Sequence, residues 1–95
     1  EQSSNDLPTN FSLFQNYPNP IITTTEIKFA IPHSSYVTLR IYNALGQEVG
    51  TIISEYLPAG EYRTSWDASN CHSGMYYYTL QAGENMKTRN MVIVR

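Results

Sequence analysis

Hydrophobic and polar residues alternate along most of the chain after residue 24. The alternation is clearest over residues 25–31, where Ile27, Phe29 and Ile31 share one parity. Successive side chains of a strand point to opposite faces, so this pattern predicts a strand with one buried face. Similar patterns predict further strands over residues 36–42, 47–53, 61–66, 74–83 and 86–95, and a short first strand within residues 11–17.

Turn-forming residues separate the predicted strands. Residues 32–35 connect the first two long strands, which we expect to be antiparallel neighbours. Asn43 and Gly46 favour a tight hairpin ahead of the next strand. The facing of the strand over 47–53 is left open, because its apolar residues fall on both parities. We expect the strand over 74–83 to have neighbours on both sides.

The predicted elements indicate an all-β fold. No segment carries apolar residues at helical spacing over a length that supports a helix. Seven strands at regular intervals are typical of an immunoglobulin-like antiparallel β-sandwich, and a barrel is the alternative. A chain of 95 residues encloses a single core, so we expect one domain. Residues 1–10 are polar and aperiodic, which indicates the end of a linker, and residues 11–95 then form the C-terminal module of a longer protein.

The overall charge argues against nucleic-acid binding. Six basic and eight acidic residues give a formal net charge of −2, so no positive field attracts phosphate. The charge is uneven, because Lys87, Arg89 and Arg95 lie in the last ten residues with no acid among them. No stretch reaches the roughly 18 apolar residues of a transmembrane helix. No signal peptide opens the chain, so we expect the signal of an exported protein to precede residue 1.

The candidate catalytic residues are few and scattered. His33 and His72 lie in turn contexts, where a solvated histidine is the usual outcome, and Cys71 is the single cysteine. The adjacent side chains of Cys71 and His72 point apart, and a reactive thiolate also needs an orienting partner. The acidic residues show no paired spacing. We therefore predict no enzyme activity, no catalytic residue and no cofactor.

Three oxygen-bearing side chains form a candidate calcium site. Asp67 ends a predicted strand, and Asn16 and Asn19 lie in the proline-containing stretch near the start. Calcium sites usually gather several acids at short spacing, whereas this set contains one. We favour the alternative, in which Asp67 caps the turn that follows it and the two asparagines bond the backbone of their own turn.

The chain has eight tyrosines, which raises the question of a binding surface. Tyr76 and Tyr78 fall on one face of their predicted strand, and Tyr77 falls on the other. We expect most of the tyrosines to be buried with their hydroxyls at the rim of the core. A surface of exposed rings that binds sugar or protein is the alternative.

The stretch FSLFQNYPNP, residues 11–20, opens the predicted domain. Prolines fix φ and lack a backbone donor, so we expect Pro18 and Pro20 to force an extended path. We expect its aromatic side chains to anchor the first strand on the sandwich: Phe11, Phe14 and Tyr17.

A set of motifs spans the chain in a fixed order: LFQNYPNP (13–20), TTTEIKFAIP (23–32), VTLRIYNALGQEV (37–49), LPAGEY (57–62), WDASN (66–70), SGMYYYTLQAG (73–83) and KTRNMVIVR (87–95). The ordered set resembles the C-terminal sorting domain, type A, of the type IX (Por) secretion system of Bacteroidetes and their relatives. The chain departs from that family at Ile21 and Ile22, where members usually continue the proline motif as Phe-Asn-Pro. Its second half also resembles the Ig-like domain of flagellar hook-capping proteins, but the QNYPNP stretch belongs to the sorting family.

The resemblance implies a function in transport rather than in chemistry. Family members fold as Ig-like sandwiches, are read by the outer-membrane translocon, and are commonly cleaved near their start by a cell-surface sortase. For this chain the resemblance implies cleavage within residues 1–10, an upstream cargo domain, and export through the periplasm to the outer-membrane surface or the extracellular space. The alternative function is an accessory carbohydrate- or protein-binding module of a secreted hydrolase.

A translocon that recognises the folded domain reads its surface. We expect it to read the edge of the last strand, the basic residues there and the exposed turns: Gly46, Gly60, Gly74, Lys87, Arg89 and Arg95. A second set of motif residues is expected to serve the structure: Asn16, Pro18, Asn19, Pro20, Pro58, Asp67, Tyr76 and Tyr78. An exposed last strand also offers an edge through which two copies could dimerise.

Overall fold

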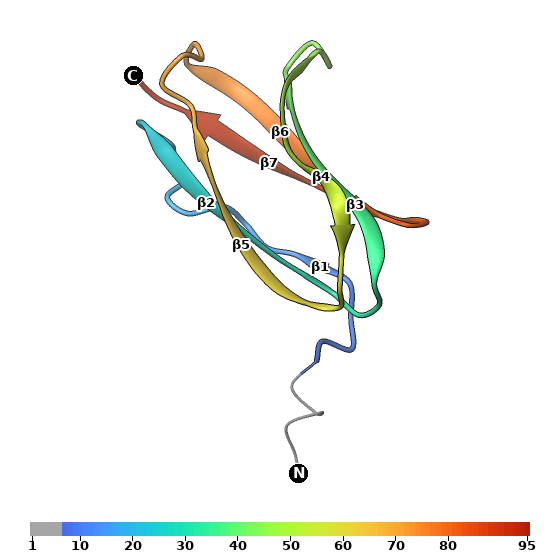
Figure 1. Ribbon diagram of the computed structural model, residues 1–95. Helices are drawn as coiled ribbons and strands as arrows, with labels where there is room; N and C mark the ends of the chain where they lie inside the picture. The colour runs from blue at the N-terminus through green and yellow to red at the C-terminus, as the bar shows by residue number, and fades with distance from the viewer. Residues whose placement is uncertain (1–6) are drawn as a thin grey trace.

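The computed structural model describes residues 7–95, which form two antiparallel sheets packed as two layers (Figure 1). One sheet has the strand order β1-β2-β5, and the other has the order β4-β3-β6-β7. The all-β sandwich of seven strands predicted from the sequence is therefore confirmed. The strands are β1 (Ser12–Leu13), β2 (Thr24–Ile31), β3 (Ser35–Asn43), β4 (Glu48–Leu57), β5 (Gly60–Asp67), β6 (Gly74–Ala82) and β7 (Asn85–Ile93).

The predicted pairing of the first two long strands is wrong. β2 pairs with β1 and β5, whereas β3 pairs with β4 and β6 in the opposite sheet. The connection at residues 32–34 therefore crosses from one layer to the other. The alternation in these strands correctly gave their buried faces, but two strands that bury facing surfaces satisfy the same alternation as two hydrogen-bonded neighbours. The prediction that residues 74–83 have neighbours on both sides is confirmed, since β6 lies between β3 and β7.

The β3–β4 hairpin forms where the turn residues predicted it. Gly46 adopts a φ of 84°, a conformation that favours glycine, and its amide donates to the carbonyl oxygen of Asn43 at 2.9 Å. β4 extends beyond the predicted end at residue 53 and pairs with β3 through two register shifts. Such shifts interrupt strict alternation, which explains why the consecutive Ile52 and Ile53 are both half-buried.

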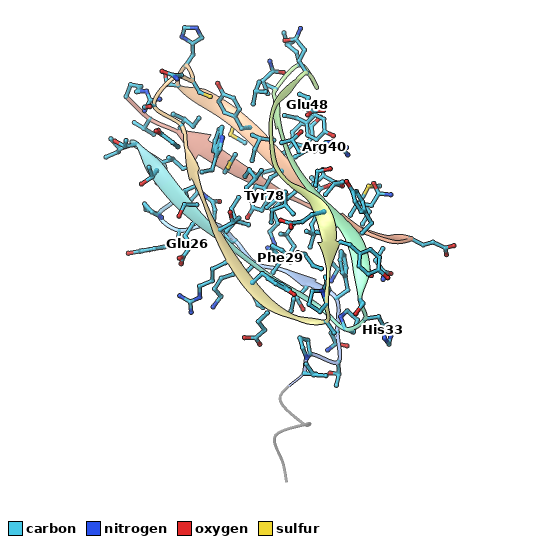
Figure 2. All side chains as sticks on the ribbon, viewed as in Figure 1. Glu26, Phe29, His33, Arg40, Glu48 and Tyr78 are labelled. Carbon is cyan, nitrogen blue, oxygen red and sulfur yellow. The ribbon has the colours of Figure 1, made fainter. Side chains whose placement is uncertain are left out.

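The core lies between the layers and is built from side chains of inward parity. Ile27, Phe29 and Ile31 of β2 are buried as predicted, and Phe29 stacks on Tyr62 of β5 at a centroid distance of 5.3 Å. Figure 2 shows Phe29 and Tyr78 between the two sheets. The other core residues are Leu13, Ile21, Val37, Leu39, Ile41, Ala68, Tyr76, Leu80, Ala82, Met91 and Ile93.

Residues 11–22, hereafter the N-terminal segment, are anchored only in part by the predicted side chains, since Phe11 is half-buried against the core. Phe14 and Tyr17 are 45% and 80% exposed, so the expectation that they anchor the first strand is wrong. Leu13 and Ile21 are buried in the core instead. In β1 the side chain of Leu13 points inward, and the alternation of an extended chain therefore turns Phe14 outward.

The prolines of the N-terminal segment lie in a bend. Residues 18–20 form a bend, so the predicted extended path is wrong. The peptide bonds before Pro18 and Pro20 are cis. The carbonyl oxygen of Pro18 accepts hydrogen bonds from Asn16 Nδ2 at 3.2 Å and from Thr25 Oγ1 at 3.0 Å. The bond from Thr25 holds the bend against the start of β2, and the bond from Asn16 closes the bend within the segment.

Candidate functional site

The N-terminal segment connects the two sheets along one side of the sandwich. Its first part belongs to the three-stranded sheet, because Leu13 pairs with Phe29 of β2. Its last part lies beside β7, where Ile21 forms a parallel bridge with Ile93. The amide of Ile21 donates to the carbonyl oxygen of Val92 at 2.7 Å, and the amide of Val94 donates to the carbonyl oxygen of Ile21 at 2.8 Å. The segment therefore covers the edge of the last strand near its C-terminal end.

Two basic side chains of β7 reach across to the same segment. The register places Lys87 and Arg89 opposite buried residues of β6, so both cations lie on the inward face of the strand. Lys87 Nζ donates to the carbonyl oxygen of Phe11 at 3.0 Å and lies 5.8 Å from the centre of its ring. Arg89 Nε donates to the carbonyl oxygen of Leu13 at 2.8 Å. Both residues are exposed, as the sequence indicated, and their side chains also hold the N-terminal segment in place.

Arg95 makes the corresponding contacts at the other end of the segment. Its guanidinium donates to the carbonyl oxygens of Ile22 and Ala68, and to that of Cys71 at 2.8 Å. Ile22 ends the N-terminal segment, and the other two acceptors lie in the connection between β5 and β6. One side chain thus joins the last residues of the chain to two separate loops.

The ion pairs of residues 7–95 lie elsewhere on the domain. Arg40 pairs with Glu48 at 3.7 Å, and Figure 2 shows these two side chains together near the β3–β4 hairpin. Arg63 pairs with Glu26 at 3.6 Å on the outer face of the three-stranded sheet. The three cations near the C-terminus bind neutral carbonyl oxygens instead of carboxylates within the described part of the chain.

A buried polar cluster lies under the middle of the N-terminal segment. The hydroxyl of Tyr78 donates to the carbonyl oxygen of Phe14 at 2.7 Å and accepts from the amide of Asn16 at 2.8 Å. Asn16 Nδ2 in turn donates to Thr25 Oγ1 at 2.9 Å. Burial raises the pKa of Tyr78, while its hydrogen bond with Asn16 acts in the opposite direction. The cluster satisfies backbone groups of a segment that has few ladder bonds of its own.

Sequence reasoning missed two members of this arrangement. Thr25 shares the inward parity of β2, and a polar residue at such a position signals a buried partner. Gln15 carries no comparable signal, yet its Nε2 donates to the carbonyl oxygen of Asn90 at 2.6 Å and to Asn16 Oδ1 at 2.7 Å. Its role depends on the path of the segment beside β7, which alternation alone does not predict.

The candidate calcium ligands are engaged by protein donors. We expected Asn19 to bond the backbone of its own turn. Instead, Asn19 Oδ1 accepts a hydrogen bond from the amide of Val92 in β7 at 3.0 Å. Asp67 Oδ1 accepts from the amide of Ser69 at 2.9 Å. Hydrogen bonds from Ser69 lower the pKa of Asp67, with a smaller contribution from Arg95. Among residues 7–95, no three His, Cys, Asp or Glu side chains cluster closely enough to hold a metal ion.

The sequence of the chain matches a known family of domains. The family model described as a secretion system C-terminal sorting domain matches residues 15–94, which include most of the N-terminal segment and all of β7. The chain belongs to this family. The sorting domain is therefore a C-terminal sorting signal of type IX secretion, and the family implies contact with the type IX machinery and export of the protein from the cell. No curated protein matches the chain.

The two histidines of the sorting domain lie at opposite ends of the fold, and Cys71 is next to His72 in the sequence. His33 is exposed in the β2–β3 connection (Figure 2), and His72 is exposed in the β5–β6 connection. These connections lie at opposite ends of the antiparallel β2–β5 pair. Cys71 is half-buried beside the core, and Tyr76 donates its hydroxyl to the carbonyl oxygen of His72 at 2.8 Å. Burial, with a smaller contribution from Cys71, raises the pKa of Tyr76.

The turn residues expected to face the translocon lie at the ends of strands. Gly46 is exposed in the β3–β4 hairpin, Gly60 begins β5, and Gly74 is exposed at the start of β6. The exposed Pro58 precedes β5, and its carbonyl oxygen accepts a hydrogen bond from the hydroxyl of Tyr62. No helix among the described residues is long and apolar enough to cross a membrane.

The tyrosines of the sorting domain divide between core and surface. Tyr76 and Tyr78 are buried, but they are the only two of the eight, so the expectation that most tyrosines are buried is wrong. Tyr36 and Tyr56 are exposed cross-strand neighbours of β3 and β4. The others are exposed or half-buried: Tyr17, Tyr42, Tyr62 and Tyr77. Tyr36 and Tyr56 therefore form a small exposed aromatic patch on the four-stranded sheet.

Proposed function

We propose that the sorting domain acts as a folded, non-catalytic address for a cargo protein in the same chain. It directs that cargo from the periplasm through the outer-membrane translocon. A sortase then cleaves within residues 1–10 and the cargo is anchored at the cell surface. The observation that supports this proposal is the family match over residues 15–94, which coincides with the folded sandwich. We also propose that residues 1–10 are a linker and that the sorting domain begins at residue 11.

The use of the polar side chains supports a role in recognition. The hydroxyl of Tyr78, the amide of Asn16 and the guanidinium of Arg95 all satisfy backbone or side-chain groups of the fold. Such residues stabilise one surface rather than activate a substrate. These contacts define the surface that the free domain presents to a partner.

We infer that the translocon reads two kinds of feature on this surface. The first is the set of turns at Gly46, Gly60 and Gly74. The second is the edge of β7 with Lys87 and Arg89, together with Arg95 after the end of that strand. Because these cations also bind carbonyl oxygens of the fold, their replacement affects both the surface charge and the position of the N-terminal segment.

The experiment fuses a signal peptide and a reporter protein to the full chain in a bacterium with a type IX system. Deletion of residues 87–95, or the K87E/R89E double substitution, is expected to leave the reporter in the periplasm. An R63E substitution changes a cation far from β7 and serves as the matched control. Normal surface display of the deletion and of the double variant would contradict the proposal.

The second candidate function is an accessory binding module of a secreted hydrolase. The exposure of Tyr36 and Tyr56, at 53% and 67%, favours it, because neighbouring exposed rings suit stacking on sugars or contact with protein. Calorimetric titration of the domain with cell-wall and plant glycans distinguishes the two candidates. The sorting proposal predicts no heat of binding, and a saturable signal abolished by Y36A/Y56A would favour the module.

A further inference from the structure

The contacts between the N-terminal segment and β7 are mostly made by side chains. β1 contributes two residues to the ladder with β2, and the amide of Tyr17 and that of Phe14 add single backbone bonds to the same strand. Toward β7, Lys87 and Arg89 supply the contacts to the first part of the segment. A segment with few ladder bonds opens more easily than the strands beneath it.

We propose that β7 and the N-terminal segment form a clasp whose opening releases the start of the domain. The carbonyl oxygens of Phe11 and Leu13 and the carboxylates of a partner protein compete for the same two cations. A carboxylate binds Lys or Arg more strongly than a neutral carbonyl oxygen does. A partner that binds β7 through its acidic residues therefore weakens the hold on the segment.

The clasp joins the last strand, where we propose that the translocon binds, to the start of the domain, which follows the proposed cleavage region. Among the described residues, Phe11 is the first with a hydrogen bond from β7, and residues 1–10 precede it in the sequence. Release of Phe11 and Leu13 therefore changes the access of a protease to the residues around them. Resting on the proposed function, this inference makes engagement of β7 the event that lengthens the freely accessible chain next to the proposed cleavage region, because residues 7, 9 and 10 are already exposed. Lys87 and Arg89 act as positioning residues in that event.

Hydrogen exchange measured by NMR on the full chain tests the clasp. The reporting amides are those of Phe14, Asn16, Tyr17 and Ile21, each of which donates a hydrogen bond in the closed segment. In the K87M/R89M variant we expect these four amides to exchange at least about tenfold faster, as loss of two charge-assisted bonds implies. Amides of β3 and β6 are expected to keep their wild-type rates.

Two controls separate the clasp from a general loss of stability. R40M removes a cation that pairs with Glu48 near the β3–β4 hairpin and is expected to leave the rates of the four reporting amides unchanged. K87R keeps the charge and an N–H donor at position 87 while Arg89 is unchanged, and it is expected to keep slow exchange. Limited proteolysis gives a second readout, with faster cleavage within residues 7–22 in K87M/R89M alone. If that variant does not fold, the single K87M substitution carries the same test.

Unchanged exchange at the four amides, or equal acceleration throughout β3 and β6, would overturn the clasp. The outcome is independent of the proposed function. Correct secretion together with unchanged exchange rejects the clasp alone. Selective acceleration together with a reporter that is never exported by the intact domain rejects the sorting proposal and leaves the clasp standing.

Discussion

Arg89 and Leu13 join the last strand of the domain to its first, because Arg89 Nε donates to the carbonyl oxygen of Leu13 at 2.8 Å. The two residues are 76 positions apart and belong to different sheets. Further hydrogen bonds between the N-terminal segment and β7 involve Lys87, Gln15, Asn19 and Ile21. The C-terminal strand is therefore a structural element of the whole sandwich and cannot be treated as an appended peptide signal.

Burial at the end of the N-terminal segment makes Ile21 a strong determinant of stability. Ile21 has no exposed surface, whereas the neighbouring Ile22 is 68% exposed. We expect Ile21→Ala to lower the free energy of unfolding by about 2–5 kcal/mol, since it leaves a cavity in the core. Ile22→Ala is the matched control and should change it by no more than roughly 0.5 kcal/mol. Urea unfolding of both variants measures the difference, and equal effects would refute the anchoring role of Ile21.

The hydroxyl of Tyr78 stabilises the middle of the same segment. Tyr78→Phe keeps the ring in the core but leaves the carbonyl oxygen of Phe14 and the amide of Asn16 without their partner. We expect a loss of about 1–3 kcal/mol in the free energy of unfolding. Tyr17→Phe, at an exposed position, is expected to have little effect. A Tyr78→Phe variant as stable as the wild type would show that water replaces the hydroxyl without cost.

Tyr78 and Tyr76 also predict how stability depends on alkaline pH. Burial raises the pKa of both phenols in the folded state. Their contribution to stability is fully present below the unfolded pKa of about 10 and is lost as the pH rises through the folded value. Chemical unfolding between pH 8 and pH 11 should therefore show a declining free energy above roughly pH 10. The decline should be shallower in Tyr78→Phe, and identical pH profiles would contradict this assignment.

Asp67 predicts a dependence of the opposite sign in acid. Hydrogen bonds from Ser69 lower its folded pKa, so its contribution is present above the unfolded value and is lost as the pH falls through the folded one. Asp67→Asn keeps an acceptor for the amide of Ser69 but cannot titrate, and we expect this variant to lack that part of the acid dependence. Asp67→Ala should lose the cap at every pH. Unfolding curves from pH 7 downward compare the three proteins, and parallel curves would argue against the prediction.

Alternation predicted the strands and their buried faces well, since inward parity follows from local sequence. Ile27, Phe29, Tyr76 and Tyr78 are all buried where the pattern placed them. Alternation did not predict which strands pair with each other. β2 and β3 show the same pattern whether they are hydrogen-bonded neighbours or face each other across the core. The bulged β4 was ambiguous for a further reason, as a register shift breaks the period of two.

The candidate site was only partly visible in the sequence. The basic residues near the C-terminus stood out through the absence of nearby acids, and the proline-containing stretch stood out through its composition. The two ends of the domain meet where Lys87 binds Phe11 and Arg89 binds Leu13. No local sequence pattern predicts this contact. The inward parity of Lys87 and Arg89, shared with the buried Met91, was the available clue.

The surface-exposed fraction of a reporter fused to the intact chain tests the central claim most directly. It is measured by protease accessibility on whole cells, in a strain with a complete type IX system and in a matched strain that lacks the outer-membrane translocon. The sorting assignment predicts reporter on the surface of the first strain and in the periplasm of the second. Equal surface exposure in both strains, or periplasmic retention in both, would contradict it.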